Sequence, residues 1–193
     1  MEYTVTNQLT GCLRLAEKAD ESYSRVRLIW AENVIFDMRS RIKCSLGTCR
    51  QYGNNFMCPP ALQGIETYRE MNGRYKLALL VQEEEAWAGT SYDAAMEKRF
   101  KALSTDNMRK LVALEKDAFS MGFPYALAAA GGSCKVCDPC KARLGEKACV
   151  HPELARPSME AMGIDIHATC RHAGLPADFQ PGRLLITGML YLC

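Results

Sequence analysis

Cysteines give this chain of 193 residues most of its chemistry. The later group lies in "GGSCKVCDPCKARLGEKACVHP", where Cys134, Cys137, Cys140 and Cys149 have the spacing C-x2-C-x2-C-x8-C. Thiols this tightly spaced let one curled loop direct three thiolates at a single object, as a cubane [4Fe–4S] cluster requires. Zinc is usually bound by two ligand pairs from separated turns. We therefore predict a [4Fe–4S] cluster, with zinc and metal-free thiols as the alternatives.

The earlier group lies in "CSLGTCRQYGNNFMCPP" and contains Cys44, Cys49 and Cys58. Its ending, Cys58 followed by Pro59, is like the Cys-Pro ending of ferredoxin motifs. Because the group is of the same kind as the later one, we predict a second cluster. Three thiols, however, leave one iron of a cubane without a partner from within the group.

Several candidates could complete this first cluster. Cys149 could cross over from the later group, since the distant fourth cysteine does so in two-cluster ferredoxins. Cys170 is the next candidate, while Cys12 and Cys193 are isolated in the sequence. The remaining possibility is an exchangeable corner held by water or substrate, and we rank this open corner first.

The two groups, in this order and followed by "RPSMEAMGID", resemble the predicted metal-binding proteins of domain-of-unknown-function family 2284. The resemblance extends over residues 33–192. It implies metal binding, and the family's occurrence mainly in archaea and anaerobic bacteria implies anaerobic metabolism. The ligands that it implies are Cys44, Cys49, Cys58, Cys134, Cys137, Cys140 and Cys149, with Cys170 as a possible addition.

The segments around the cysteines must form the scaffold that positions them. An extended stretch is predicted over residues 33–44, and short helices are predicted over 61–73 and 156–163. Strands are predicted over 75–82, 125–132 and 182–192, with a long helix over 91–123 between the first two. A strand–helix–strand order favours a right-handed βαβ crossover. We expect an α/β or α+β fold with a small mixed sheet, the cysteine loops (about 44–60 and 131–152) lying at one edge.

Composition narrows the class of protein. A hydrophobic content of 48% and a charged content of 24% are typical of one globular domain, here residues 1–193. The net charge of +2 demands neither nucleic acid nor a membrane as partner. The start of the chain has no signal-peptide pattern, so we expect a cytoplasmic protein in which the ten cysteines are reduced rather than paired as disulfides.

These observations predict a redox function. Two adjacent cluster motifs, without a recognisable nucleotide-binding loop, favour a carrier of single electrons that serves a redox partner protein. One alternative is an enzyme that binds a small molecule at an open iron. Another is an adaptor stabilised by zinc.

Overall fold

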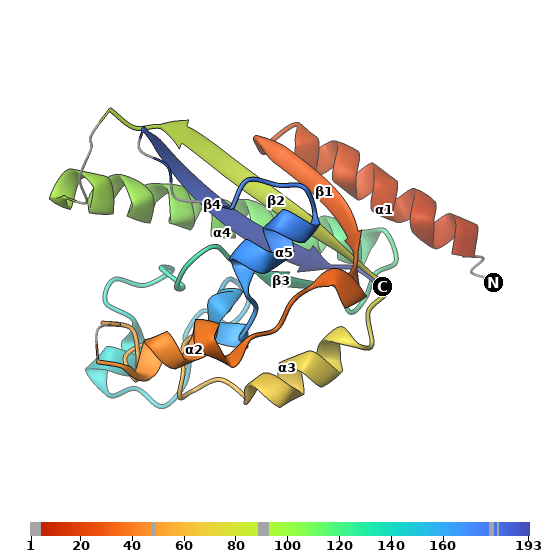
Figure 1. Ribbon diagram of the computed structural model, residues 1–193. Helices are drawn as coiled ribbons and strands as arrows, with labels where there is room; N and C mark the ends of the chain where they lie inside the picture. Colours follow the sequence, from red (N-terminus) through yellow and green to blue (C-terminus); the bar gives the residue numbers. More distant parts are fainter. Residues whose placement is uncertain (1–4, 48, 89–92, 178–179, 181) are drawn as a thin grey trace.

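The computed structural model describes residues 5–47, 49–88, 93–177, 180 and 182–193. Its centre is a four-stranded sheet with the order β1-β2-β4-β3, seen in Figure 1. The strands are β1 (Arg25–Trp30), β2 (Leu77–Ala86), β3 (Leu127–Ala129) and β4 (Arg183–Tyr191). All three neighbouring pairs are antiparallel.

Alternation along β2 supplies two apolar surfaces, because successive side chains of a strand point to opposite faces. Leu79 and Val81 belong to one core, and Ala78 and Leu80 belong to the other. The first core is covered by α1 (Val5–Asp20) and α4 (Ala94–Ser120), which also contact each other.

The opposite face of the sheet is covered by α5 (Ile166–His172) and by the 3-10 helix η3 (Glu160–Met162). Met159, Met162 and Ile164 bring the segment around η3 into this second core, where all three are fully buried. The sheet is therefore sandwiched between helical layers. Within the described ranges, no helix combines the length and apolarity that crossing a membrane requires.

The remaining elements carry the cysteine loops. Helix α2 (Met38–Ser45) begins at Asp37, whose side chain accepts a hydrogen bond from Arg39 N, and it ends just after Cys44. A loop leads from α2 to α3 (Ile65–Asn72), and the later cysteine loop, which includes η2 (Lys141–Leu144), follows β3. In Figure 1 these parts form the lower portion of the molecule, on the other side of the sheet from α1.

The predicted α+β fold with a crossover is confirmed, but the sheet is not mixed. Strands β2 and β3 run parallel and are joined by α4, but β4 lies between them, so neighbouring strands are antiparallel rather than mixed. The parallel pairing among the described residues is an isolated bridge between Ala130 and Ser158.

The local structure differs from the prediction in three places. Residues 33–44 were expected to be extended, but the Asp37 cap begins helix α2 within them. Strand β2 continues past the predicted end at residue 82 through Glu83–Glu85, because each of these residues pairs with β4. Helix α1 and strand β1 were not predicted. Strand β1 pairs with β2 along its whole length.

Candidate metal centre

The two cysteine loops meet through a buried amide. Asn55, which is 2% exposed, donates from Nδ2 to the carbonyl oxygen of Cys134 over 2.9 Å. Its Oδ1 accepts a hydrogen bond from Met57 N at 3.0 Å, so both ends of the side chain have partners. A buried amide with satisfied hydrogen bonds fixes the position of both loops. Asn55 therefore holds the earlier cysteine loop against the start of the later one.

The three thiols of the earlier group interact electrostatically. Burial raises the pKa of the Cys58 thiol to about 12, and the nearby thiols of Cys49 and Cys44 add to that shift. Burial also raises the pKa of Cys44, again with a contribution from Cys49. Helix α2 provides Cys44 from its last turn, while Cys58 is almost fully buried at the far end of the loop. The end of this loop at Cys58 therefore lies within electrostatic reach of its start at Cys44.

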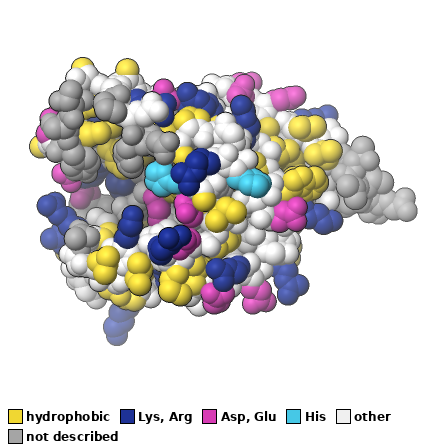
Figure 2. Space-filling view, in the orientation of Figure 1, with side chains coloured by type: hydrophobic (Ala, Val, Ile, Leu, Met, Phe, Trp, Pro, Cys, Tyr) yellow, Lys and Arg dark blue, Asp and Glu magenta, His cyan; other side chains and the backbone are white. Residues whose placement is uncertain are grey.

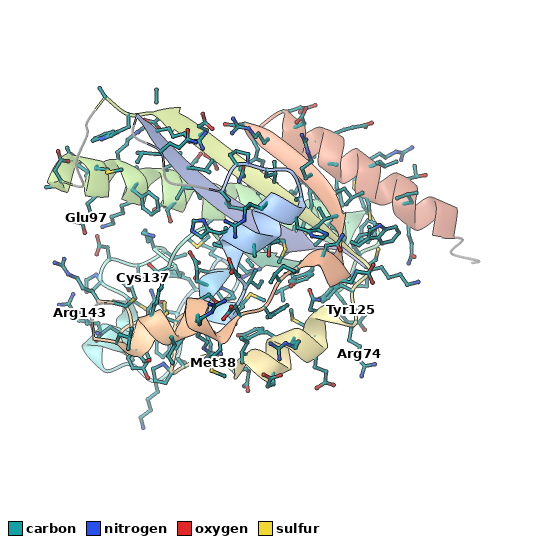
Figure 3. All side chains as sticks on the ribbon, viewed as in Figure 1. Met38, Arg74, Glu97, Tyr125, Cys137 and Arg143 are labelled. Atoms are coloured by element: carbon teal, nitrogen blue, oxygen red, sulfur yellow. The ribbon has the colours of Figure 1, made fainter. Side chains whose placement is uncertain are left out.

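The later group has a corresponding arrangement around Cys134. Burial raises the pKa of this thiol, and the thiols of Cys149 and Cys140 act in the same direction. Backbone N–H groups of Val136 and Arg156 donate to the sulfur and oppose the shift. Cys137 is partly buried in the same loop. Figure 3 labels Cys137 and Arg143 of this loop. Hydrogen bonds of this kind stabilise a thiolate and help to set cluster potentials.

Cys134 also belongs to the surroundings of the earlier group, because its thiol raises the pKa of Cys58. Lys135 lies at the same junction and interacts electrostatically with both thiols. Its Nζ donates to Ser104 Oγ at 2.8 Å and to Ser133 O at 2.9 Å. Burial lowers the pKa of Lys135, and the two thiols oppose this shift. Lys135 is therefore held by hydrogen bonds at the point where the two groups meet.

Helix α4 positions the later loop from the scaffold side. Ser104 Oγ donates to Gly131 O at 2.7 Å, and Asn107 Oδ1 accepts from Gly131 N at 3.2 Å. Farther along the helix, Glu115 pairs with Arg156 at 2.6 Å, and both side chains are largely buried. These contacts attach both ends of the later loop to one rigid helix.

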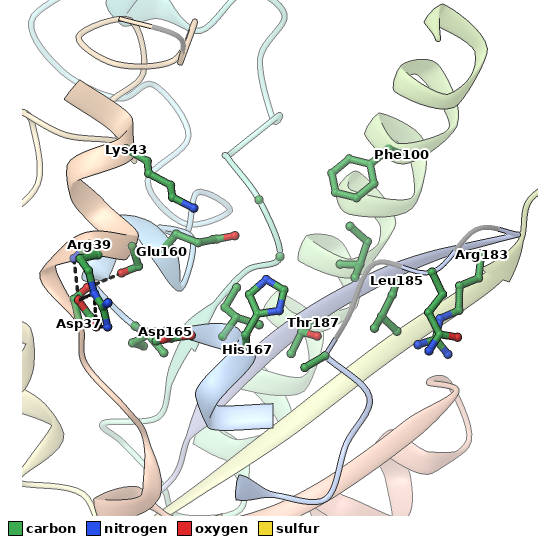
Figure 4. A pocket seen from close by; sticks show the side chains of 18 residues that line it. Asp37, Arg39, Lys43, Phe100, Glu160, Asp165, His167, Arg183, Leu185 and Thr187 are labelled. Carbon is green, nitrogen blue, oxygen red and sulfur yellow. Dashed lines mark hydrogen bonds and ion pairs between the residues drawn. The ribbon is translucent and has the colours of Figure 1, made fainter. Parts of the chain in front are cut away.

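A cavity of about 650 Å³ lies between the cysteine region and the sheet. Figure 4 shows Lys43 of α2 and Glu160 of η3 extending into it from one side, with His167 at its centre and Phe100 across from them. Ile164, Leu185 and Ile186 add apolar wall, and Gly131 and Gly132 bring the start of the later loop to its edge. The cavity adjoins the earlier group, because Glu160 contributes to the raised pKa of Cys44.

The other three cysteines lie elsewhere. Cys170 is fully buried in the second core, where its sulfur is 3.6 Å from Gln82 Nε2 and 3.8 Å from Thr187 Oγ1. Cys12 and Cys193 lie together in the first core. The predicted seven thiols are therefore gathered in two adjoining loops, while Cys170 has its own polar partners under α5.

The described side chains do not form a finished metal site. Among them, no group of three or more His, Cys, Asp or Glu side chains is already arranged to hold a metal ion. The donor chemistry nevertheless fits iron–sulfur clusters, because two nearby sets of thiols approach one another and one sulfur already accepts backbone N–H groups.

Sequence reasoning missed the residues that connect the two groups. None of Asn55, Lys135 and Ser104 is a ligand position of a known motif. Each forms a hydrogen bond with a residue distant in sequence. The signal that could have indicated Asn55 is an amide three residues before Cys58, in a loop with few apolar residues. Lys43 and Glu160, which line the cavity, gave no sequence signal of their own.

Comparison with known proteins gives one positive finding. A family profile described as predicted metal-binding protein, domain of unknown function 2284, matches residues 27–192. No curated protein and no solved structure matches the chain.

Proposed function

Because this chain belongs to the predicted metal-binding proteins of domain-of-unknown-function family 2284, we propose that it binds two [4Fe–4S] clusters and passes single electrons to a partner protein in anaerobic metabolism. Such clusters supply one-electron redox chemistry when bound. In this proposal the ligands of the first cluster are Cys44, Cys49 and Cys58, and those of the second are Cys134, Cys137, Cys140 and Cys149.

The observation that carries the proposal is the meeting of the two groups at Cys58 and Cys134. The thiol of Cys134 contributes to the raised pKa of Cys58, and Asn55 connects the two loops by its hydrogen bond to the carbonyl oxygen of Cys134. Metal centres held so close can exchange electrons without a large movement of the protein. Lys135 supplies positive charge at the junction, which favours thiolates and the additional negative charge of a reduced cluster.

The charge of the cysteine loops suggests the kind of partner. Residues 38–60 and 131–152 together contain eight Lys and Arg but two Asp and Glu, a net charge of +6 in a chain whose total is +2. Exposed apolar side chains, including Ile42, Leu46 and Leu144, lie in the same segments. Figure 2 shows basic and apolar side chains intermingled over this lower-left region. An acidic redox protein would be attracted to such a surface.

Reduction of the anaerobically purified protein tests this function. We expect dithionite to bleach the visible absorption and to produce paramagnetic resonance signals from two magnetically interacting clusters, with reversal on reoxidation. Interaction is expected because the two groups adjoin. A protein whose absorption and resonance do not change with dithionite would contradict the proposal.

A second candidate function is an enzyme that binds a small molecule in the cavity beside the earlier cysteine group. A volume of about 650 Å³ is in the range of small-molecule sites, and apolar walls with a few polar groups are their usual lining. In this candidate the fourth corner of the first cluster is open to the cavity. The ligand would then reach iron past Glu160, which interacts with Cys44.

The charges of the cavity favour a small zwitterion, such as an α-amino acid. Its lining contains three cations and three carboxylates, so it offers no excess charge to a polyanion. Asp37 pairs with Arg39, and Asp165 accepts a hydrogen bond from Ala168 N. Among the described residues, Lys43 forms no ion pair and Glu160 Oε2 has no hydrogen-bond partner. A zwitterion would present its carboxylate to Lys43 and its ammonium group to Glu160.

Calorimetry with a set of small amino acids, and with succinate as a dianion, tests the cavity. We expect an amino acid to bind, and we expect Lys43→Ala and Glu160→Gln each to weaken binding at least tenfold by removing one charged partner. Arg109→Ala is the matched control, since Arg109 is an exposed cation of α4 outside this cavity. Preferential binding of succinate, or equal binding by all the variants, would reject this candidate.

A further inference from the structure

Two cysteines outside the proposed metal centre have adjacent thiols. Cys12 lies on α1 and Cys193 follows β4, and their side chains share a hydrogen bond. Cys12 belongs to the core cluster on the α1 face of the sheet, and the partly buried Cys193 packs against that cluster. The two cysteines are 181 positions apart in the sequence, so the fold and not local spacing brings them together.

The fold holds each thiol in place. Cys12 is fully buried, in the same core as Leu15 and Ala19 of its own helix. Cys193 is fixed through its backbone, since its carbonyl oxygen accepts hydrogen bonds from Leu77 N at 2.9 Å and from Lys76 N at the start of β2. Cys193 as a residue is only partly buried. Of the two residues, it is therefore the one that a reagent in solution can approach.

We propose that Cys12 and Cys193 form a redox-active dithiol, which small-molecule disulfides oxidise to an intramolecular disulfide. The proposal is independent of the metal content of the cysteine loops. It differs from the sequence-based expectation, in which both residues were isolated.

The exposure of the two residues sets the order of the reaction. The Cys193 thiolate attacks a small disulfide, forms a mixed disulfide and releases one small thiol. Cys12 then loses its proton, and its sulfur attacks the Cys193 sulfur and displaces the second small thiol. The two protein thiols are oxidised by two electrons in total, and the small disulfide is reduced to two thiols. Burial and the neighbouring Cys193 raise the pKa of Cys12 to about 12, so Cys193 is the thiol that reacts first.

The bond would attach helix α1 covalently to the end of the central strand β4. It would also close a loop containing nearly the whole chain, which restricts the unfolded state strongly. We therefore expect the melting temperature of the oxidised protein to rise by roughly 10 °C.

The test is anaerobic treatment of the intact metal-loaded protein with oxidised glutathione, followed by alkylation and peptide mass spectrometry. We expect a cross-linked peptide pair containing Cys12 and Cys193, and the rise in melting temperature that dithiothreitol reverses. Cys12→Ser should instead accumulate glutathione on Cys193, because the resolving thiol is absent. Cys193→Ser should remain unmodified at the buried Cys12.

Cys12→Ala repeats the first variant without placing a hydroxyl in the core, in case the serine protein does not fold. The iron content of wild type before and after oxidation is a separate readout, which distinguishes this reaction from attack on the cysteine loops. Stable glutathione on Cys193 of the wild type without a cross-link would overturn the proposal. So would a cross-link to any other cysteine, or no reaction at either residue.

Discussion

Replacing Cys134 with serine is expected to lower the iron and sulfide content by at least half and to weaken what remains. Cys134 adjoins Cys140 and Cys149 in its own group, and its thiol also affects Cys58 in the other. Serine is a poor ligand for iron, so the later cluster should be lost. The earlier cluster should become less stable, because the loop that carries Cys134 is attached to it through Asn55.

The control is Cys170→Ser, a substitution of the same kind at a sulfur that contacts Gln82 and Thr187 in the core. This variant should keep its full complement of iron. Wild-type iron and sulfide in Cys134→Ser would contradict the proposed later cluster. Loss of a cluster in Cys170→Ser would reject the open corner and favour four thiolate ligands for the earlier cluster.

The second large effect is expected for Gly131→Ala. A Cβ atom at this position would collide with Ile186 Cγ2 and lie 2.7 Å from the backbone oxygen of Thr187. Both neighbours belong to the central strand β4, which cannot move away easily because Ile186 and Thr187 pair with Glu83 and Gln82 of β2. We expect a loss of about 1–3 kcal/mol in the free energy of unfolding. Displacement of the later loop should also reduce its metal content.

Gly64→Ala is the matched control, because its added Cβ would meet no atom within 4 Å and the backbone φ of Gly64 is −64°. It should melt close to wild type and retain its metal. Chemical denaturation and iron analysis of both variants check this prediction. A Gly131→Ala protein as stable and as metal-rich as Gly64→Ala would show that the close approach to β4 is unimportant.

Much of the scaffold could be predicted because its signals are local. The long helix and the apolar strands follow from periodicity, and the end of the short helix at Gly73 follows from a stop residue. The interposition of β4 between β2 and β3 could not be predicted, since strand order depends on pairing between distant segments. The apolar start of residues 33–44 suggested an extended stretch, but the cap at Asp37 outweighed it.

The candidate site shows the same division. The spacing of the cysteines is a local property of the sequence, so the two groups could be identified from it. Their meeting through Asn55, and the placement of Lys135 beside Ser104, depend on contacts between residues far apart in the chain. For the same reason Cys12 and Cys193 gave no signal, although the fold brings their thiols together.

The central claim is that the two cysteine groups hold iron–sulfur clusters, and the most direct test is the metal and sulfide content of protein purified without oxygen. We predict a brown protein with about eight iron and about eight acid-labile sulfide per chain, as two cubane clusters require. A colourless protein with stoichiometric zinc and no sulfide would contradict the claim and favour the zinc-stabilised adaptor.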